Sequence, residues 1–307
     1  MNAITLDHVV KRFGTTEAVR ELSLSVGTGE MFGLIGPDGA GKTTTIRMIC
    51  GLLRSDAGRI TVLGHDPIRD HRALTGSVGY HSQRFSLYGD LSIDENIAFF
   101  AEIHGLRHYT DRRDRLLDMT QLTPFRLRLA DQLSGGMKQK LALACTLVHE
   151  PSLVLLDEPT TGVDPISRRE FWKLLSEFRA EGVTIVMATP YLDEAERCSR
   201  VALLHEGRLL ADDTPDSLRA AMTGALFEVI VADHRRAHDA IARLPHVSSV
   251  QMFGERAHVR LGEDGSASAD VLRQELREAG LTVESVRPIA TSLEDVFIAR
   301  LGGEQSS

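Results

Sequence analysis

The segment GPDGAGKTT, residues 36–44, combines glycines, a lysine and threonines in a spacing that suits a bound phosphate group. It follows the apolar run MFGLIG (31–36) and opens a helix-like stretch, as the pattern G-x-x-x-x-G-K-[ST] requires. Glycines let backbone N–H groups curl around phosphate oxygens, and the helix N-terminus adds positive potential. We expect Lys42 to reach the β and γ phosphates of a nucleotide and Thr43 to ligate Mg²⁺.

The whole segment is therefore predicted to line a nucleotide site. Asp38 places a carboxylate in this anion-binding loop, and we expect its side chain to point outward. A glycine-rich turn with a chance lysine is the alternative, but it would need neither the strand nor the helix. The predicted nucleotide-binding residues of the segment are Gly36, Pro37, Asp38, Gly39, Ala40, Gly41, Lys42, Thr43 and Thr44.

A second motif, SLVLLDEP (152–159), is a continuous apolar run that ends in two carboxylates. Such a run is typical of a parallel strand buried on both faces. We expect Asp157 to hold Mg²⁺ and Glu158 to orient and deprotonate the attacking water, which requires the two side chains to point differently. An acidic pair after a strand can also be a mere helix cap, so this motif does not decide the function alone.

A third motif, LSGGMKQK (133–140), precedes the helical pattern of the following residues. Ser134 and the N–H groups of Gly135 and Gly136 would form a second anion site at a helix N-terminus. A plain Ser-Gly-Gly helix start is the alternative.

Together the three motifs resemble the ATP-binding cassette (ABC) ATPases, whose signature is an LSGGQ-like sequence. The resemblance covers about residues 3–222. It implies that Phe13 stacks on adenine, that Gln83 contacts Mg²⁺ and the attacking water, and that Asp164 bridges two cassettes. Without the family, Phe13 would be interpreted as a core residue and Asp164 as part of an Asp-Pro turn.

Cassettes of this family resemble half-sites that pair head to tail, with each ATP between the phosphate loop of one and the signature of the other. The family also places a switch histidine after the strand that follows the Asp164 segment. Here that place is taken by Pro190, in Thr189-Pro190-Tyr191, and His205 belongs to the next strand. Thr189 can cap a helix with Pro190 in its first position.

Two interpretations of Pro190 remain open. Either Tyr191 or a water supplies the missing contact, or this chain's own ATP site hydrolyses ATP slowly. We favour slow hydrolysis, because preorganised hydrogen-bond donors contribute strongly to transition-state stabilisation. The signature LSGGM is intact, so the chain could complete a site on a partner's phosphate loop. The sequence is similar to the first cassette of bacterial tandem-cassette exporter ATPases.

The elements that must position these residues alternate between strands and helices, which predicts a mainly parallel α/β sheet. The early strands, before residue 36, favour antiparallel hairpins, and 84–133 is predicted to be an inserted helical lobe. Predicted strands are 3–10, 22–26, 31–36, 59–63, 77–81, 152–157, 183–188 and 200–211, and predicted helices are 42–52, 92–104, 111–121, 134–149, 166–180 and 191–198.

The composition changes after about residue 222, which predicts a cassette domain at 1–222 and a small domain at 223–307. The order of the second domain is βαββαβ, the ferredoxin-like motif. Its last helix carries SLEDVFIARLGG (292–303), similar to the tail of bacterial drug-export ATPases; docking on its own domain is the simpler role for its apolar face. The segment 262–270 is predicted to be a loop and GGEQSS to be frayed.

The predicted fold class is thus α/β: a P-loop ATPase core with an antiparallel β subdomain and a helical subdomain, plus a small α+β ferredoxin-like domain.

Composition limits the class of protein. Hydrophobic residues make up 42% of the 307, which excludes global disorder, and a formal charge of −8 argues against nucleic acid as the main partner. Three cysteines without metal-ligand spacing fit a reducing compartment. No secretory segment and no run of 18 apolar residues occur, so we expect a protein that does not span a membrane by itself.

The sequence therefore predicts the ATP-binding subunit of a bacterial membrane exporter, cytoplasmic and peripheral on the inner face of the cell membrane. It would use ATP and Mg²⁺, pair with a second cassette as a homodimer or heterodimer, and drive a separate membrane-spanning subunit through the 84–133 lobe. The alternatives are a soluble cassette ATPase of DNA repair or translation, and a regulatory subunit with little turnover. The transported substrate does not follow from the sequence.

Overall fold

The computed structural model describes residues 1–83, 87–232, 234–262 and 268–304. The chain divides into two compact units, Met1–Pro215 and Asp216–Ser307. The division falls at the start of α8 (Pro215–Ala220), whereas composition places the predicted boundary at 222–223, beyond that helix. Parts of the predicted loop 262–270 and of the predicted frayed end lie outside the described residues.

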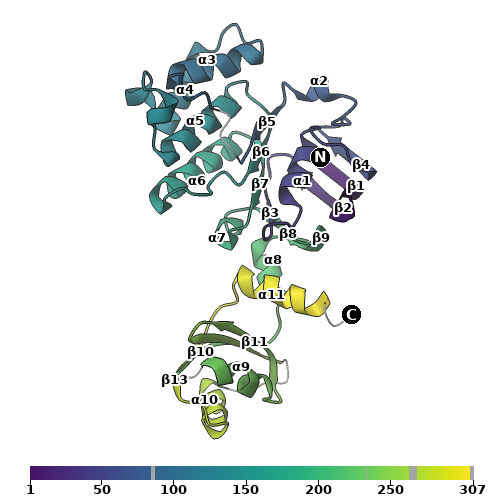
Figure 1. Ribbon diagram of the computed structural model, residues 1–307, viewed down its shortest axis with the longest axis vertical. Helices are drawn as coiled ribbons and strands as arrows, with labels where there is room; N and C mark the ends of the chain where they lie inside the picture. The colour runs from purple at the N-terminus through teal and green to yellow at the C-terminus, as the bar shows by residue number, and fades with distance from the viewer. Residues whose placement is uncertain (84–86, 233, 263–267, 305–307) are drawn as a thin grey trace. The chain divides into compact units, whose positions relative to one another are not determined.

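The centre of the first unit is a six-stranded sheet in the order β5-β6-β7-β3-β8-β9, parallel except for the last pair (Figure 1). The apolar runs of β3, β6 and β7 are buried at every residue, as expected of central parallel strands. The strands are β3 (Met31–Ile35), β5 (Val78–His81), β6 (Leu153–Asp157), β7 (Thr184–Thr189), β8 (Arg200–His205) and β9 (Arg208–Asp213).

The single strand predicted at 200–211 is wrong, because β8 and β9 form an antiparallel hairpin. Glu206 and Gly207 adopt positive φ angles of 47° and 80° between them, which is the left-handed conformation of a tight hairpin turn. In the sequence, the polar stretch His205-Glu206-Gly207-Arg208 separates two apolar runs and marks this turn.

A second, three-stranded sheet is antiparallel in the order β2-β1-β4, as the early strands predict. Its strands are β1 (Asn2–Phe13), β2 (Thr16–Gly27) and β4 (Ala57–Val62). Ile4 and Val9 of β1 share one core with Leu34 of β3 and with Ile46 of α1 (Lys42–Ile49). This shared core fixes the tip of the β1–β2 hairpin relative to the start of α1.

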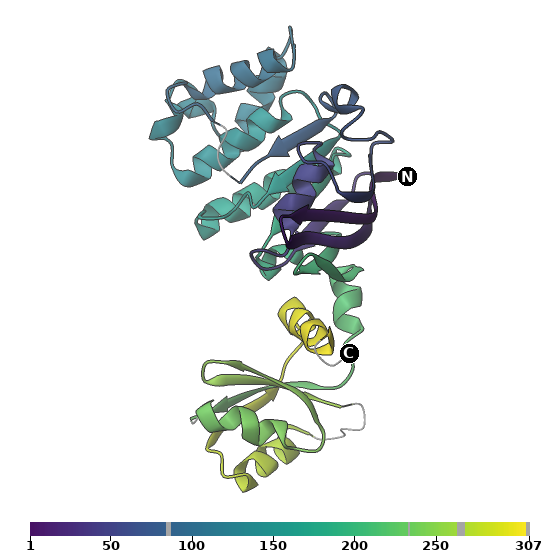
Figure 2. The same ribbon diagram turned by 45° about the vertical axis from the view of Figure 1, so that its right-hand side comes forward.

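A helical lobe, α3 (Ile93–Ile103), α4 (Thr110–Thr120) and the start of α5 (Gly135–Leu147), lies with α6 (Pro165–Ala180) on the other side of the sheet from β1, β2 and β4 (Figures 1 and 2). This confirms the predicted helical subdomain, although 84–86 lie outside the described residues. The 3₁₀ turns η1 (Thr123–Phe125) and η2 (Ala130–Gln132) connect α4 to α5, and α2 (His71–Leu74) precedes β5.

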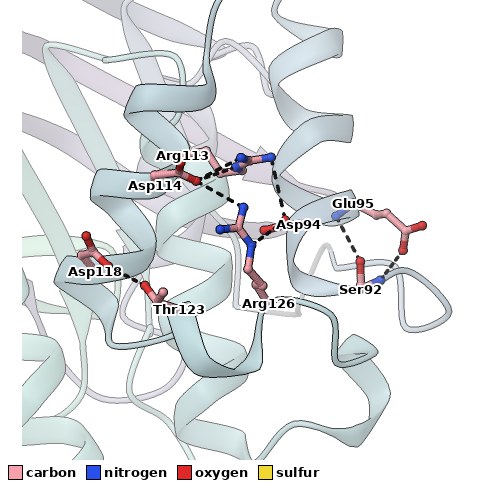
Figure 3. A network of polar contacts seen from close by, with 8 residues as sticks. All are labelled: Ser92, Asp94, Glu95, Arg113, Asp114, Asp118, Thr123 and Arg126. Carbon is pink, nitrogen blue, oxygen red and sulfur yellow. Dashed lines mark hydrogen bonds and ion pairs between the residues drawn. The ribbon is translucent and has the colours of Figure 1, made fainter.

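Polar side chains hold the lobe together (Figure 3). Ser92 and Glu95 form a reciprocal capping box at the start of α3. Arg126 donates to Asp94 of α3 at 2.8 Å and to Asp114 of α4 at 3.3 Å, so one guanidinium joins the two helices.

The second unit has the predicted βαββαβ order and a four-stranded antiparallel sheet in the order β11-β12-β10-β13. Its own core lies between the sheet and α9 and α10, and includes Val229, Val259 and Leu276. The elements are β10 (Leu226–Val231), α9 (His234–Ala242), β11 (Val247–Phe253), β12 (Arg256–Leu261), α10 (Ala269–Glu278), β13 (Val283–Pro288) and α11 (Leu293–Glu304).

Candidate nucleotide site

The phosphate loop joins β3 to α1 through a left-handed glycine. Gly41 has a φ of 96°, and a Cβ there would lie 2.5 Å from the carbonyl oxygen of Ala18, so only glycine fits. Helix α1 begins at the next residue, Lys42, whose side chain is buried. The ammonium Nζ of Lys42 donates to the carbonyl oxygens of Gly36 at 2.8 Å and Pro37 at 3.0 Å. The ammonium group of Lys42 is therefore held at the phosphate loop.

Thr43 and Asp157, far apart in the sequence, meet at this loop. The hydroxyl of Thr43 donates to Oδ1 of Asp157 at 2.9 Å, and Asp157 is fully buried at the end of β6. Burial raises the pKa of Asp157. The hydrogen bond from Thr43 acts to lower this pKa, and the neighbouring charge of Glu158 acts to raise it. The second oxygen, Oδ2, is buried without a hydrogen-bond partner among the described residues. A buried oxygen pair of this kind fits a hard cation such as Mg²⁺.

Glu158 turns away from Asp157 because its backbone adopts a positive φ of 51°. This conformation costs on the order of 1–3 kcal/mol in a residue with a side chain, and such strain is concentrated at functional sites. Oε2 of Glu158 accepts a 2.9 Å hydrogen bond from Nε2 of Gln83, and Oε1 lies 3.5 Å from Nζ of Lys42. The two adjacent carboxylates thus have different partners, as their predicted roles require.

Lys42, Thr43, Gln83 and Glu158 line one pocket of about 510 Å³, whereas Asp157, Gly36 and Pro37 are not among its lining residues. Phe13 lies in its wall at the end of β1, with 51% of its surface exposed, so it is not the core residue that the sequence alone would favour. Nζ of Lys11 lies 5.4 Å from the Phe13 ring centroid. Asp38 also lines the pocket and is exposed, in line with the outward orientation predicted for it.

The pocket also contains residues that no motif identified. They are Thr16, Glu17, Ala18, Arg20 and Glu206. They come from the β1–β2 hairpin and the β8–β9 turn, whose approach to the phosphate loop depends on the packing of the two sheets. Composition and spacing carry no signal for that approach.

The signature residues lie outside this pocket. Ser134 caps α5, accepting from the backbone N–H of Met137 at 3.3 Å. A Cβ on Gly136 would lie 2.3 Å from Oγ of Ser167 in α6, so the glycine permits close contact between the two helix starts. Asp164 caps α6, and its Oδ1 accepts from the N–H groups of Ile166 and Ser167, both at 3.0 Å. The chain therefore presents two separate glycine-containing helix starts, one at α1 and one at α5.

Comparison with known proteins agrees with this geometry. The family model described as "ABC transporter" matches residues 19–161, and the model "ATP-binding protein DrrA1-3-like, C-terminal domain" matches residues 214–300. The daunorubicin resistance ATP-binding protein DrrA3 of Streptomyces coeruleorubidus is 35% identical over 308 residues, which are 99% of this chain and 97% of that protein. The chain belongs to the ATP-binding cassette family.

Other relatives carry export or multidrug names. The probable multidrug ABC transporter ATP-binding protein YbhF of Escherichia coli is 42% identical over 311 residues, 99% of this chain. The chain spans about half of YbhF, 53% of its length. A solved structure of an ATP-binding subunit of an ABC transporter superimposes with a TM-score of 0.65 at 30% identity, covering 71% of this chain and 92% of that one. The predicted family and fold are confirmed, and the relatives' names favour the exporter interpretation over a non-transport ATPase. None of the helices among the described residues has the length and apolar character to cross a bilayer.

At the corner where cassettes carry the switch histidine, Thr189 ends β7 and Pro190 follows it. Helix α7 (Leu192–Ala195) begins only after Tyr191, which is its N-cap residue. The prediction that Thr189 caps a helix with Pro190 in its first position is therefore wrong. Thr189 stays in the sheet, paired with Ile35 of β3, and its hydroxyl accepts from the N–H of Tyr191 at 3.1 Å.

A buried carboxylate, that of Glu194, organises this corner, and no sequence motif indicates it. Glu194 accepts from the hydroxyl groups of Thr189 at 2.6 Å and Thr160, and from Nη2 of Arg168 at 2.8 Å. The Arg168 guanidinium also lies 4.7 Å from the Tyr191 ring centroid. Tyr191 is thus stacked against α6, and neither Pro190 nor Tyr191 is among the residues that line the nucleotide pocket.

Proposed function

We propose that this chain is the ATP-binding subunit of a bacterial membrane exporter, which hydrolyses MgATP to ADP and phosphate and thereby drives efflux through a separate membrane-spanning subunit. One observation carries the proposal: Lys42, Thr43, Gln83 and Glu158 line one pocket, and Asp157 adjoins it through the hydrogen bond from Thr43. The direction of transport, out of the cell, is inferred from the names of the relatives.

In this proposal each residue has a defined part. The loop N–H groups and Lys42 hold the β and γ phosphates, and Thr43 and Asp157 hold Mg²⁺, which neutralises phosphate charge. Gln83 orients the water, and Glu158 accepts its proton as the water oxygen bonds to the γ-phosphorus and the bond to the β–γ bridging oxygen breaks. Phe13, exposed at the pocket wall, stacks on adenine.

The separation of the signature from the pocket supports a head-to-tail pair of cassettes. Ser134, Gly135 and Gly136, with Asp164 beside them, would meet the γ-phosphate bound by the partner's phosphate loop. The partner is a second cassette, identical or different, and the membrane subunit would contact the 84–133 lobe. We therefore propose that the chain is located at the inner face of the cell membrane and has no nucleic acid partner.

A regulatory subunit with little turnover is the second candidate, and Pro190 favours it. The Tyr191 ring lies against Arg168, and neither Pro190 nor Tyr191 lines the nucleotide pocket. Neither side chain therefore replaces the histidine as a hydrogen-bond donor to the γ-phosphate. We therefore propose that this chain's own site hydrolyses slowly while its signature completes a competent site on a different partner, as in the first cassette of a tandem pair.

The primary test is MgATP binding measured by calorimetry. Lys42→Ala removes the charge paired with the β and γ phosphates, so the affinity is expected to fall at least about tenfold, the usual size of a lost charge-assisted hydrogen bond. Arg243→Ala, at an exposed position of the second unit, is the matched control and should bind as the parent does. Equal affinity of the Lys42 variant and the parent would contradict the site assignment.

A further inference from the structure

The second unit contains a pocket of about 480 Å³ that the exporter function does not use. It is lined by residues of β10, β11, β12 and α11, all within Asp216–Ser307. Within this unit, α11 lies on the opposite side of the sheet from α9 and α10 (Figures 1 and 2). The pocket is lined partly by α11, and of its lining residues Val250 also packs against the unit's core. Volumes of this size are typical of small-molecule sites.

Arg260 is the residue that makes this pocket unusual. Only 6% of it is exposed, and its guanidinium donates to two neutral acceptors, the carbonyl oxygen of Thr223 and the hydroxyl of Thr291, both at 3.2 Å. A guanidinium carries five N–H donors. Within the described part of the chain, no carboxylate lies within 4.0 Å of it. Burial lowers the pKa of Arg260, and the nearby charge of Asp295 offsets part of this shift.

The carboxylate that also lines the pocket, Asp295, is engaged elsewhere. Its Oδ1 accepts from His258 Nδ1 at 2.8 Å, and its Oδ2 accepts from the N–H and hydroxyl of Ser292 at 2.8 and 2.6 Å. Burial acts to raise the pKa of Asp295, but the hydrogen bonds from Ser292 and His258 outweigh it and lower the pKa. Asp295 therefore stays charged and holds the start of α11, while Arg260 keeps unused donors.

A buried charge is unfavourable unless it is paired, and an arginine fork matches a carboxylate in two parallel hydrogen bonds. Half of the remaining lining is polar, with Ser248, Ser249, Gln251 and His258, and half is aliphatic, with Leu226, Val250, Ile298 and Ala299. We propose that this pocket binds a small amphiphilic carboxylate, its head group on Arg260 and its aliphatic body against these side chains.

The test is calorimetry on the full chain, with octanoate as the probe. One equivalent should bind, whereas 1-octanol, with the same chain and no charge, and inorganic phosphate, with charge and no chain, should bind at least tenfold more weakly. Lys42→Ala should leave the octanoate affinity unchanged, which excludes binding at the phosphate loop.

The decisive variant is Arg260→Met, which removes the charge and keeps an unbranched apolar stem. We expect octanoate affinity to fall at least about tenfold, while Arg243→Met, an exposed arginine of the same unit, has no effect. If Arg260→Met does not fold, Ile298→Glu keeps the arginine and places a competing carboxylate in the pocket, with the same expected loss. Three results would overturn the proposal: octanol binding as tightly as octanoate, no octanoate binding by the parent, or unchanged octanoate affinity in a folded Arg260→Met or Ile298→Glu variant. Arg260 would then have only a structural role, as a hydrogen-bond donor to Thr223.

Discussion

At the scale of single residues, the site depends on two adjacent carboxylates that the backbone separates. The positive φ of Glu158 sends its side chain to Gln83 and Lys42, while Asp157 remains at the end of β6 beside Thr43. Because the two groups have different neighbours, one can hold a cation while the other accepts a proton. Changing either one should therefore affect a different step.

Glu158→Gln tests that separation. The amide keeps the size of the side chain and an oxygen acceptor for Gln83, so MgATP affinity should be close to that of the parent. Turnover in the purified complex should fall by about 10²-fold or more, because general-base catalysis typically contributes that much. Undiminished turnover would assign the chemistry to the partner's site and favour the regulatory candidate.

Pro190→His tests whether the corner lacks a donor. A preorganised transition-state donor is worth about 10²–10³ in rate, so the histidine should raise the turnover of a site completed by any partner signature. The short helix should survive, because its N-cap is Tyr191 and Glu194 still ties Thr189 to Arg168. ATP affinity and circular dichroism must match the parent.

Tyr191→Phe is the companion variant. The stacking of the ring on Arg168 predicts no effect on turnover. If the loss of the hydroxyl alone removes activity, the tyrosine has replaced the histidine and the site is altered rather than slow.

The motif residues were predictable because their spacing is fixed by local geometry. Lys42 and Thr43 are the first residues of α1, directly after the loop. Asp157 is the last residue of a strand whose continuous apolar sequence predicts that it is buried. Glu194 was not predictable, since its partners Thr160, Thr189 and Arg168 come from three separate segments. The misplaced cap at Thr189 has the same origin, because pairing of Thr189 with β3 decides where the helix begins.

At the scale of elements, the ends of α3 and α5 are joined by stacked imidazoles. The ring centroids of His104 and His149 lie 3.7 Å apart with an interplanar angle of 4°. Burial, with a further contribution from the charge of His104, lowers the pKa of His149 to about 4. In the unfolded chain an imidazole has a pKa of about 6.5.

This difference predicts acid destabilisation of the first unit. As the pH falls below about 6.5, the unfolded chain takes up a proton that folded His149 does not accept until about pH 4. The free energy of unfolding should thus fall over this window, with His149 contributing on the order of 1 kcal/mol between pH 7 and pH 5 after allowance for partial exposure. His149→Phe keeps a stacking ring without a titrating group and should flatten the curve in urea unfolding, whereas the exposed His108→Phe should not. Identical slopes for the parent and His149→Phe would remove the stacked pair as the cause.

Element types followed from periodicity, but their ends did not. The β8–β9 turn divides the predicted strand 200–211 into two, and α7 is shorter than the acidic run 191–198 indicates. Both ends are set by tertiary contacts: β8 pairs with β3, and the carboxylate of Glu194 is buried against α6 and β7 instead of lying on an exposed helix.

At the scale of the whole molecule, each unit has its own core. Ile4, Leu34 and Ile46 belong to the core of the first unit, and Val229, Val259 and Leu276 to that of the second. The residues lining the nucleotide pocket end at Glu206, and those lining the Arg260 pocket begin at Leu226. The two binding functions should therefore be separable.

Deleting residues 223–307 tests this separation. The truncated chain retains α8 and every residue of the nucleotide pocket, so it should fold and bind MgATP with the parent's affinity while losing octanoate binding. Lys42→Ala in the full chain should do the reverse, and Lys42→Ala in the truncated chain should lose both ligands. A truncated chain that is folded by circular dichroism yet does not bind MgATP would mean that the second unit supports the nucleotide site, and the two units would then have to be treated as one cooperative structure.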